Sequence, residues 1–305
     1  MEVCCTIIKG SYQHGAACLI NSLLRAGFDG CFVIGTFGRQ PYFLTAASED
    51  GVDYSYLNNK IQIRQLRLDT GLHPGYVKPF LVQHVLELIP DVDSVHYFDA
   101  DICVHAPWSF FREWCKAGVA VVRDGNFPRL AFDHPWRQHW RRLLNRAGHS
   151  VVSQNTELYA NAGYVALSRD SLSFLKIWLD SHEQWRKEGN DMQSYSLDRR
   201  YLPVTSDQDL FNAALMAYPK RISILGPEGM GFNGHHFIMT HGTEDFKPWF
   251  GFLLPRALRG YCPSRYAHFF RNVYTAPIRS NSRIVSIAGK LDLFLSKAVA
   301  RFVKA

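Results

Sequence analysis

The segment SVHYFDADICV, residues 94–104, joins an apolar strand to two carboxylates that stand one residue apart. Alternating β-branched and aromatic residues predict a buried strand, but a buried strand does not tolerate an unpaired Asp-x-Asp. Side chains at positions i and i+2 point the same way, so Asp99 and Asp101 could bind Mg²⁺ or Mn²⁺ and leave places for phosphate oxygens. The alternative is a strand-end turn in which Asp99 caps the next segment and Asp101 faces water. Asp-x-Asp is short and common, so the spacing alone leaves both readings open.

Strands and helices alternate along the chain around this segment. Apolar runs predict further strands at residues 3–8, 31–35, 61–68, 118–122 and 162–167. Helical spacing of apolar residues predicts helices at residues 16–26, 76–88, 171–183 and 210–218. This alternation predicts an α/β fold with a mostly parallel central sheet and helices on both faces. Ligands of such folds bind at the carboxyl ends of parallel strands, where Asp99 and Asp101 lie.

The composition is typical of a folded protein of the cytoplasm. With 305 residues, 47% hydrophobic and 20% charged, the chain can build a sizeable core, which excludes a disordered protein. Seven cysteines without a CxxC pair indicate reduced core thiols and argue against a zinc site. The N-terminus lacks the features of a signal peptide, and no apolar run reaches the ~18 residues of a membrane-spanning helix. We therefore expect a cytoplasmic protein. A peripheral position on the cytosolic face of a membrane remains an alternative.

The positive charge is concentrated in the C-terminal residues 250–305. This segment holds ten Lys and Arg against one acid, Asp292, whereas the first 249 residues carry a net charge of −2. From Arg283 onward apolar residues recur at helical spacing, beside a stripe of Lys and Arg. Such a helix could lie on an anionic membrane, or pack its apolar face on the rest of the protein. Aromatic residues in the segment raise nucleic-acid binding as a third option, but no RNA-binding motif accompanies them, so we expect no nucleic-acid partner.

A segment rich in Trp, His and Arg, residues 124–159, shows no clear periodicity. This composition favours a loop or lid over a polar ligand, although such residues also pack at ordinary surfaces.

Three further motifs place polar groups at the ends of predicted elements. Asn161-Ala162-Gly163 opens an apolar strand, as expected where a ligand needs a hydrogen bond and close backbone approach. Ser206-Asp207-Gln208-Asp209 precedes a helix, where Ser206 is also a natural N-cap and acids favour the first turn. The sequence HGTEDFKPW, residues 241–249, follows an apolar run.

Taken together and in this order, the motifs resemble the retaining glycosyltransferases of family 8, which have the GT-A fold. The resemblance covers roughly residues 3–249, which we take as a catalytic domain (1–249), followed by a basic, aromatic helical extension (250–305). The most specific part is the combination of Asp-x-Asp, Asn-Ala-Gly, Asp-Gln-Asp and His-x5-Lys-Pro-Trp, since each alone is weak. The resemblance implies transfer of a hexose from a nucleotide sugar, usually a UDP-sugar, to a saccharide or lipid-linked glycan acceptor.

The resemblance also implies roles for single residues. Asp99, Asp101 and His241 would bind Mn²⁺ or Mg²⁺, and Lys247 would contact the diphosphate. Lys78 stands where the family carries a basic residue near the nucleotide. A bound cation and Lys247 would together stabilise the charge that develops on the leaving diphosphate.

The donor sugar would be held by a second set of residues. By the same resemblance, Asn161, Asp207 and Gln208 would contact the sugar, and an acid at Asp124 would touch donor or acceptor. The adjoining motif positions, which belong to the same nucleotide-sugar-binding segments, are Ala100, Ala162 and Gly163.

The sequence departs from the family at two places. The first strand ends in Ile8-Lys9-Gly10-Ser11-Tyr12 without the acid that often binds base or ribose, although Tyr12 could stack on a base. Glu244 stands where the family usually has a glycine, which predicts a different shape for the diphosphate loop. A catalytically silent sugar-nucleotide-binding protein is therefore one alternative.

The stereochemistry has its own alternatives. Gln208 is a poor nucleophile and Asp207 is only a candidate, so we favour attack on the same face as the leaving group. An inverting GT-A enzyme would instead need a carboxylate base opposite the donor, for which Asp124 or Asp209 could serve.

Overall fold

The structure is a computed structural model that describes residues 1–44, 54–58, 60–127, 129–152, 157–195 and 204–303. Its strands are β1 (Glu2–Lys9), β2 (Cys31–Phe37), β3 (Tyr54–Leu57), β4 (Ile61–Arg67), β5 (Ser94–Phe98), β6 (Ile102–Val104), β7 (Val119–Arg123), β8 (Ala160–Ser168), β9 (Ile222–Leu225) and β10 (Met239–His241). Its α-helices are α1 (Gln13–Ala26), α2 (Lys78–Leu88), α3 (Trp108–Lys116), α4 (Pro135–Arg146), α5 (Ser173–Lys187), α6 (Asp207–Ala217), α7 (Leu254–Ala257), α8 (Arg265–His268) and α9 (Arg283–Val303). Short 3₁₀ or π turns are η1 (Gly10–Tyr12), η2 (Pro74–Val77), η3 (Arg169–Ser171), η4 (Pro227–Met230) and η5 (Phe269–Val273).

Eight strands form the central sheet, in the order β3-β4-β2-β1-β5-β8-β7-β9. The pairs β4-β2, β2-β1, β1-β5 and β7-β9 are parallel, while β3 and β8 run against their neighbours. The sheet is therefore mostly parallel, as predicted. Because β8 is reversed, its first residues lie at the same edge of the sheet as the last residues of β5.

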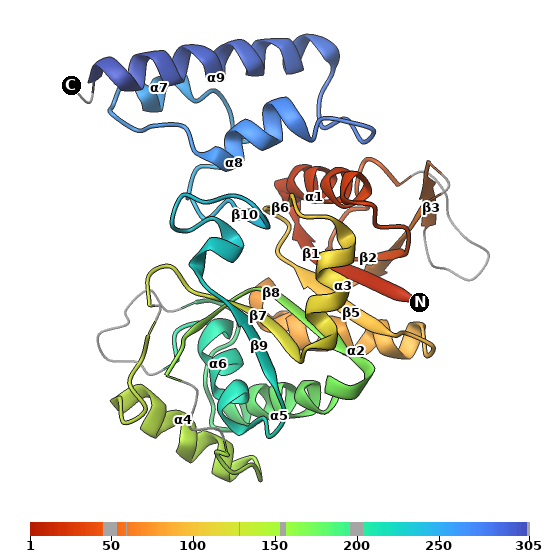
Figure 1. Cartoon of the computed structure of the whole chain (residues 1–305), viewed down its shortest axis with the longest axis vertical. Helices are drawn as coiled ribbons and strands as arrows, with labels where there is room; N and C mark the ends of the chain where they lie inside the picture. The colour runs from red at the N-terminus through yellow and green to blue at the C-terminus, as the bar shows by residue number, and fades with distance from the viewer. Residues whose placement is uncertain (45–53, 59, 128, 153–156, 196–203, 304–305) are drawn as a thin grey trace.

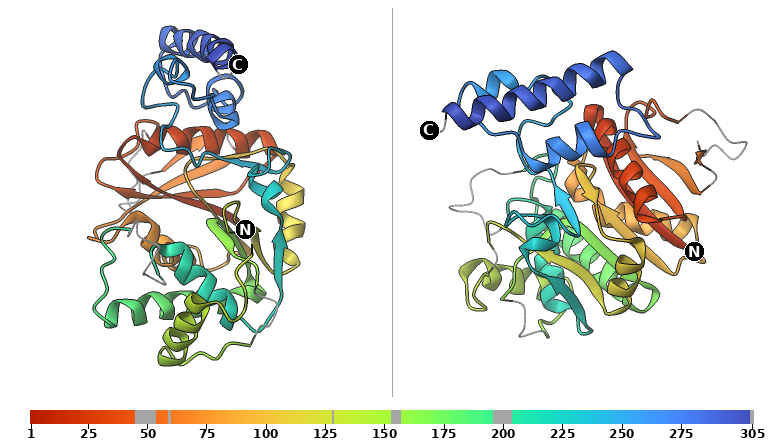
Figure 2. Two further views of the ribbon diagram at one scale, coloured as in Figure 1. Left: turned by 90° about the vertical axis from the view of Figure 1, so that its left-hand side faces the viewer. Right: turned by 45° about the horizontal axis from the view of Figure 1, so that its top comes forward.

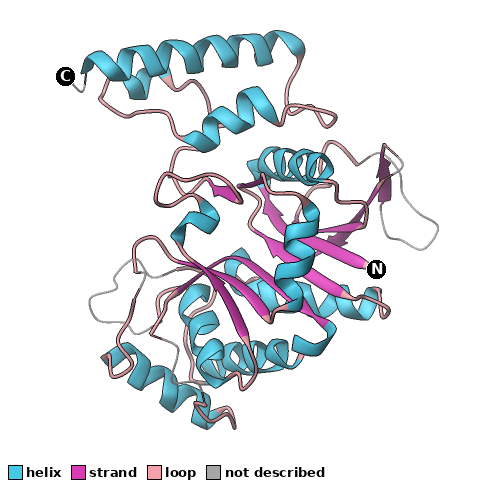
Figure 3. Ribbon diagram, viewed as in Figure 1, coloured by secondary structure: helices cyan, strands magenta, loops and turns pink. Residues whose placement is uncertain are grey.

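Helices cover both faces of this sheet (Figures 2 and 3). Alternate residues of β1 point to opposite sides: Val3, Cys5 and Ile7 pack with α2, α5 and α6, whereas Cys4 and Ile8 pack with α1 and α3. Apart from Thr6, the buried side chains of β1 are apolar on both faces, which explains why β1 reads as a nearly continuous apolar run. The predicted α/β class is confirmed.

The strand predicted before the two carboxylates is β5, and a second strand that was not predicted, β6, follows them. β5 stays in the main sheet, the chain turns at the acidic residues, and β6 pairs instead with β10 in a separate antiparallel ribbon. The turn keeps both carboxylates at the sheet edge because their polar groups would be costly inside it.

The expectation of a loop or lid over residues 124–159 is wrong for the middle of that segment, which contains α4. His134 caps this helix by accepting a hydrogen bond from Trp136 N, and Pro135 stands at its first turn. Trp140 and Arg137 are fully buried, so α4 is part of the core. Because α4 is rich in aromatic and Arg residues, its apolar residues showed no clear helical periodicity in the sequence.

The C-terminal extension, residues 250–303, packs beyond α1 (Figure 1). Asn21 of α1 bonds to Tyr274 O, Ile278 O and Ile278 N at 3.0, 2.8 and 2.9 Å. The one acid of the extension, Asp292, accepts hydrogen bonds from Leu253 N and Leu254 N. It also forms an ion pair with Arg271. Asp292 therefore ties α9 to α7 and leaves the other basic side chains without an acidic partner in the extension.

Within the described residues, none of the helices is both long enough and apolar enough to cross a membrane.

Candidate active site

The acidic turn is fixed from two sides by backbone pairing. Asp99 N donates to Gly163 O of β8 at 2.7 Å, and Gly242 N donates to Asp101 O at 2.8 Å. In the ribbon, His241 of β10 lies opposite Ile102 of β6. A residue about 140 positions downstream is thereby held next to the Asp-x-Asp turn, as the resemblance implied.

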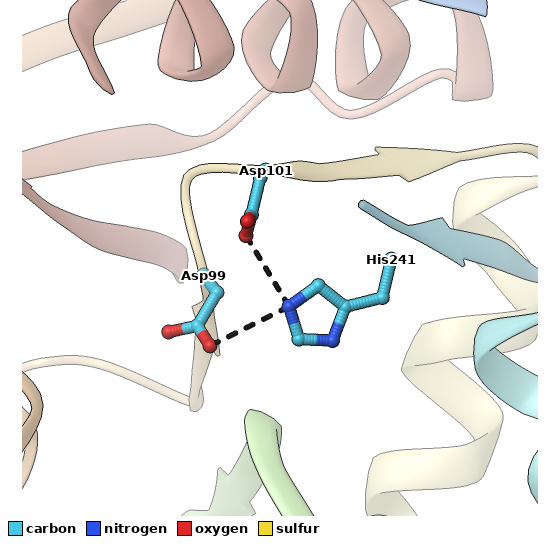
Figure 4. A group of neighbouring side chains, drawn as sticks. All are labelled: Asp99, Asp101 and His241. Atoms are coloured by element: carbon cyan, nitrogen blue, oxygen red, sulfur yellow. Dashed lines mark ion pairs between the residues drawn. The ribbon is translucent and has the colours of Figure 1, made fainter. Parts of the chain in front are cut away.

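Asp99, Asp101 and His241 converge in this turn (Figure 4). His241 Nε2 lies 3.2 Å from Asp101 Oδ1 and 3.7 Å from Asp99 Oδ2. One ligand atom from each residue fits within 4.8 Å of the others. Two carboxylates and an imidazole form a mixed oxygen and nitrogen donor set that suits Mn²⁺, and also Mg²⁺ if waters or phosphate complete it. The residues present therefore fit the cation that the sequence predicted.

Two buried lysines form ion pairs with these carboxylates. Lys247 Nζ lies 2.9 Å from Asp101 Oδ2, and Lys78 Nζ lies 3.0 Å from Asp99 Oδ1 and 3.1 Å from Asp207 Oδ2. Burial lowers the pKa of both ammonium groups, but the facing carboxylates outweigh it and raise each pKa above its usual value. Both lysines therefore carry a charge at neutral pH, where they can bind phosphate oxygens.

The Asp101 carboxylate is also held in its charged form. Burial raises its pKa, but His241 and then Lys247 outweigh this effect and hold the pKa well below its usual range. A carboxylate that stays ionised throughout the physiological range is a competent ligand for a cation.

Asn161, Asp124 and Gln208 form a hydrogen-bond network beside the turn. Asn161 Nδ2 and Gln208 Nε2 both donate to Asp124 Oδ2, at 2.9 and 3.2 Å. The other Asp124 oxygen accepts Asn126 N at 2.8 Å and Phe127 N at 3.0 Å. This network orients both amides at the edge of the sheet.

The backbone of β8 completes the same network. Gln208 Oε1 accepts Ala162 N at 3.1 Å, and Asn161 Oδ1 accepts Gly163 N at 2.9 Å. Ala162 O in turn accepts Lys78 Nζ at 3.0 Å. The structure thus brings the predicted Asn-Ala-Gly and Asp-Gln-Asp motifs together.

The two acids of the Asp-Gln-Asp motif differ in their surroundings. Burial raises the pKa of Asp207, but Lys78 outweighs it, and Tyr195 donates to its other oxygen, so the pKa lies below its usual value. Asp209 accepts hydrogen bonds from Tyr159 Oη at 2.6 Å and Thr205 N at 2.9 Å, which makes it a structural residue in the first turn of α6. Ser206 makes no side-chain cap, contrary to the N-cap interpretation.

A cavity of about 360 Å³, the donor-side cavity, opens over the acidic turn. Of the site residues proposed from the sequence, this cavity is lined by Tyr12, Lys78, Asp99, Ala100, Asp101 and His241. Ile8 does not line it, because its side chain packs under α1.

Sequence reasoning missed the other residues that line this cavity: Ile7, Lys9, His73, Pro74, Gly75, Tyr97 and Tyr195. Tyr97 could have been found from its alternation with Asp99 on the strand, and it donates to Asp99 Oδ1 at 2.9 Å. Gly75 could also have been found, because a Pro-Gly pair stands shortly before Lys78 in the sequence. In the structure, a Cβ at Gly75 would collide with the Tyr195 hydroxyl. The sequence held no comparable signal for Tyr195.

Lys247 and Trp249 lie on the loop after β10. Trp249 packs edge-on against Tyr12, with ring centroids 5.5 Å apart, and a Cβ at Gly15 would collide with the indole. The loop is therefore seated on the start of α1, which positions Lys247 over Asp101.

Comparison with known proteins yields a likeness of fold. No protein-family model and no curated protein matches the sequence. The chain is similar to the solved structure of WbbM, described as a bifunctional glycosyltransferase in its apo form, with a TM-score of 0.52 and 16% sequence identity. The match covers 95% of this chain and 51% of the WbbM chain, so this chain spans about half the length of that protein. The fold of a glycosyltransferase is thus shared, and any activity is argued from the site itself.

Proposed function

We propose that this protein is a metal-dependent glycosyltransferase that moves a hexose from a UDP-sugar to a saccharide or lipid-linked glycan, with retention at the anomeric carbon. The observation that carries the proposal is the convergence of Asp99, Asp101 and His241 beneath Lys247. The likeness of fold to a glycosyltransferase and the resemblance of the motifs to family 8 support it. The proposed catalytic unit is residues 1–249, with residues 250–305 as an extension.

The proposed roles follow from charge and position. Asp99, Asp101 and His241 would hold Mn²⁺ or Mg²⁺, which when bound supplies positive charge to the diphosphate. Lys247 would exchange its bond to Asp101 for a phosphate oxygen, and Tyr12 would contact the nucleoside at the cavity rim. The buried position of Lys247 strengthens its attraction to an anion, because water does not screen the pair.

The surroundings of Asp207 and Gln208 favour a retaining mechanism without a covalent intermediate. Asp207 is tied to Lys78 and Tyr195, so its charge is engaged and it is a weak candidate for a covalent nucleophile. Gln208 is oriented by Asp124 and the backbone and would position the sugar. The leaving phosphate would then accept the proton of the acceptor hydroxyl on the same face.

An inverting mechanism is less compatible with the site. The base it needs would be Asp124 or Asp209, yet each of these carboxylates already accepts at least three hydrogen bonds. NMR of the anomeric proton in the first-formed product distinguishes the two mechanisms.

The first experiment is a thermal-shift titration with UDP and UDP-sugars, with and without Mn²⁺. A ligand that binds only the folded state raises the unfolding temperature, so wild type should be stabilised by UDP when Mn²⁺ is present. Asp101→Asn should lose this metal-dependent shift, whereas Asp91→Asn, an exposed acid just before β5, should keep it. An equal shift in wild type and Asp101→Asn would contradict the proposed site.

Turnover separates the enzyme from a silent binding protein. Mn²⁺-dependent release of UDP from UDP-glucose or UDP-galactose is expected in wild type and not in Asp101→Asn. Metal-dependent binding without any UDP release, across donors and saccharide acceptors, would favour the silent protein instead.

We also propose that α9 rests on the anionic cytosolic face of a membrane. The face of α9 that packs on the protein carries the buried residues Asp292, Leu293, Ser296 and Ala300. Apart from Leu293, most of its large apolar residues point away, with Ile287 68%, Phe294 69% and Phe302 83% exposed. This exposure supports a membrane contact for the apolar face of α9 over its packing on the protein.

The charge beside this face matches an anionic surface. Arg283, Lys290 and Arg301 are exposed along α9 and Lys297 is half-buried, while Lys304 lies outside the described residues. An apolar face next to a basic stripe is the pattern of a helix that lies in the interface of an anionic bilayer.

A further inference from the structure

A second polar cavity lies next to the donor-side cavity. It has a volume of about 430 Å³, and His241 lines both cavities. Its walls come from the end of β7, the segment between η4 and β10, and the residues around the start of α8. We infer that this second cavity, the acceptor cavity, binds the saccharide acceptor, so that the C-terminal extension forms part of the active site. The inference rests on the proposed function.

The position of the cavity, next to the proposed sugar-binding residues, is the first argument for an acceptor site. Asp124 and Asn161 line the acceptor cavity and belong to the network that also fixes Gln208. These are the residues proposed to contact the transferred sugar, so the cavity begins where the anomeric carbon would lie. An acceptor hydroxyl has to approach that carbon closely for transfer to occur. The cavity is also in the size range of small-molecule sites.

The chemistry of the walls fits a saccharide. Glu244 presents carboxylate oxygens, which can accept hydrogen bonds from sugar hydroxyls. Phe232 adds an apolar ring surface, which suits the C–H face of a pyranose. A mostly polar lining that includes the ring of Phe232 matches an amphipathic sugar ring better than it matches an apolar ligand.

Phe232 is held in place by its neighbours. Its backbone N donates to Pro227 O at 3.0 Å, and its ring lies 6.0 Å from the His241 ring, centroid to centroid. A Cβ at Gly125 would lie 2.8 Å from Phe232 Cβ, so the absence of a side chain there gives Phe232 its place. The ring is thereby a fixed wall beside a proposed metal ligand.

Arg265 supplies a cation from the extension. Its guanidinium is exposed, and no hydrogen bond or ion pair to another described residue engages it. The backbone around it is rigid, because Ser264 Oγ accepts Ala267 N at 3.1 Å and Tyr266 is fully buried. Five free N–H donors on a fixed helix start can bind hydroxyls or an acidic group of a saccharide.

The experiment measures saccharide binding by saturation-transfer NMR, with UDP and Mn²⁺ present. The probes are glucose, galactose, N-acetylglucosamine, lactose, maltose and glucuronic acid. At least one should bind wild type, and Phe232→Ala and Arg265→Met should each weaken that binding by about tenfold or more. Arg259→Met, which removes an exposed arginine of the same extension outside the cavity, should not change it.

Unchanged saccharide affinity in both Phe232→Ala and Arg265→Met would overturn the inference, as would a wild type that binds none of the probes. Thermal unfolding of each variant shows whether it is folded, and Arg265→Met changes only an exposed side chain. If wild type shows no metal-dependent binding of UDP, the proposed function fails. If UDP binds but the saccharide result is negative, only the assignment of the acceptor cavity fails.

Discussion

Lys247 and Asp101 form a buried pair that a cation at the acidic turn has to loosen. Their Nζ and Oδ2 atoms lie 2.9 Å apart, and each side chain is less than a tenth exposed. A buried carboxylate is costly without a partner, so Lys247 stabilises Asp101 as long as no cation does. A donor diphosphate gives Lys247 a new anionic partner, and cation and nucleotide should therefore bind cooperatively.

We predict that Lys247→Met separates the two ligands. Mn²⁺ alone should bind more tightly than to wild type, because the competing ammonium group on Asp101 is gone. UDP in the presence of Mn²⁺ should bind at least about tenfold more weakly, because a hydrogen bond between charged groups contributes about 1.5–3 kcal/mol. Isothermal titration calorimetry measures both affinities.

The matched control for this prediction is Lys187→Met. Lys187 pairs with Glu183 at 3.1 Å on the surface of α5, far along the chain from the acidic turn. Its loss should leave both affinities unchanged. Equal or tighter binding of UDP by Lys247→Met would show that this lysine does not hold the diphosphate.

At the scale of elements, the reversed direction of β8 builds the site. A parallel β8 would place Asn161 and Gly163 at the opposite edge of the sheet from Asp99. Because β8 runs antiparallel to β5, Gly163 O instead accepts Asp99 N, and β10 brings His241 to the same place.

Gly163 is required where these elements meet. A Cβ built there would lie 2.6 Å from His241 Cε1 and 2.8 Å from Asn161 Oδ1, closer than non-bonded atoms approach, and 3.0 Å from Asp99 Oδ2, which is a tight contact. We predict that Gly163→Ala displaces one of these proposed ligands and weakens Mn²⁺-dependent UDP binding at least about tenfold, measured by calorimetry, by analogy with the loss from disturbed ligand geometry.

Gly71→Ala is the control for the glycine substitution, since nothing lies within 4 Å of a Cβ at that position. It should bind UDP like wild type. If Gly163→Ala also bound UDP like wild type, the contact between β8 and His241 would not matter for the ligand.

Local patterns predicted most elements, whereas pairing over long distances escaped them. The apolar runs of β1 and β2 and the helical period of α1 are properties of neighbouring residues, so the sequence contains them. The direction of β8 and the pairing of β6 with β10 depend on contacts between distant segments, and no local period encodes those. The meeting of Asp99 with His241 was therefore expected only through the resemblance, and Tyr195 in the donor-side cavity was not expected at all.

At the scale of the whole molecule, the C-terminal extension contributes to two surfaces. Its residues Ser264–Tyr266 border the acceptor cavity, while α9 carries exposed apolar and basic residues. Helix α9 lies on the far side of the extension from the central sheet (Figure 1). Helix α9 is joined to the rest of the extension through Asp292, Arg271 and Leu253. If α9 rests on a bilayer, the acceptor cavity is held near the membrane surface, which favours a lipid-linked glycan as the acceptor.

We predict that the double substitution Ile287→Ser and Phe294→Ser weakens binding to anionic vesicles at least about tenfold. Burial of each large apolar side chain contributes about 1.5–3 kcal/mol, and both side chains are more than two thirds exposed in the protein alone. Co-sedimentation with vesicles of phosphatidylcholine containing phosphatidylglycerol measures the binding. Vesicles of phosphatidylcholine alone should bind wild type more weakly, because each basic residue contributes about 1 kcal/mol at an anionic surface.

Val152→Ser tests whether the effect belongs to α9, since Val152 is an apolar residue 53% exposed that lies outside the C-terminal extension. This variant should sediment like wild type. Because Ile287 and Phe294 point away from the protein, their replacement by serine leaves the buried face of α9 intact, and UDP binding should persist in the double variant. Equal sedimentation of wild type and the double variant would rule out the apolar face of α9 as the membrane contact, and the extension would then serve the acceptor cavity alone.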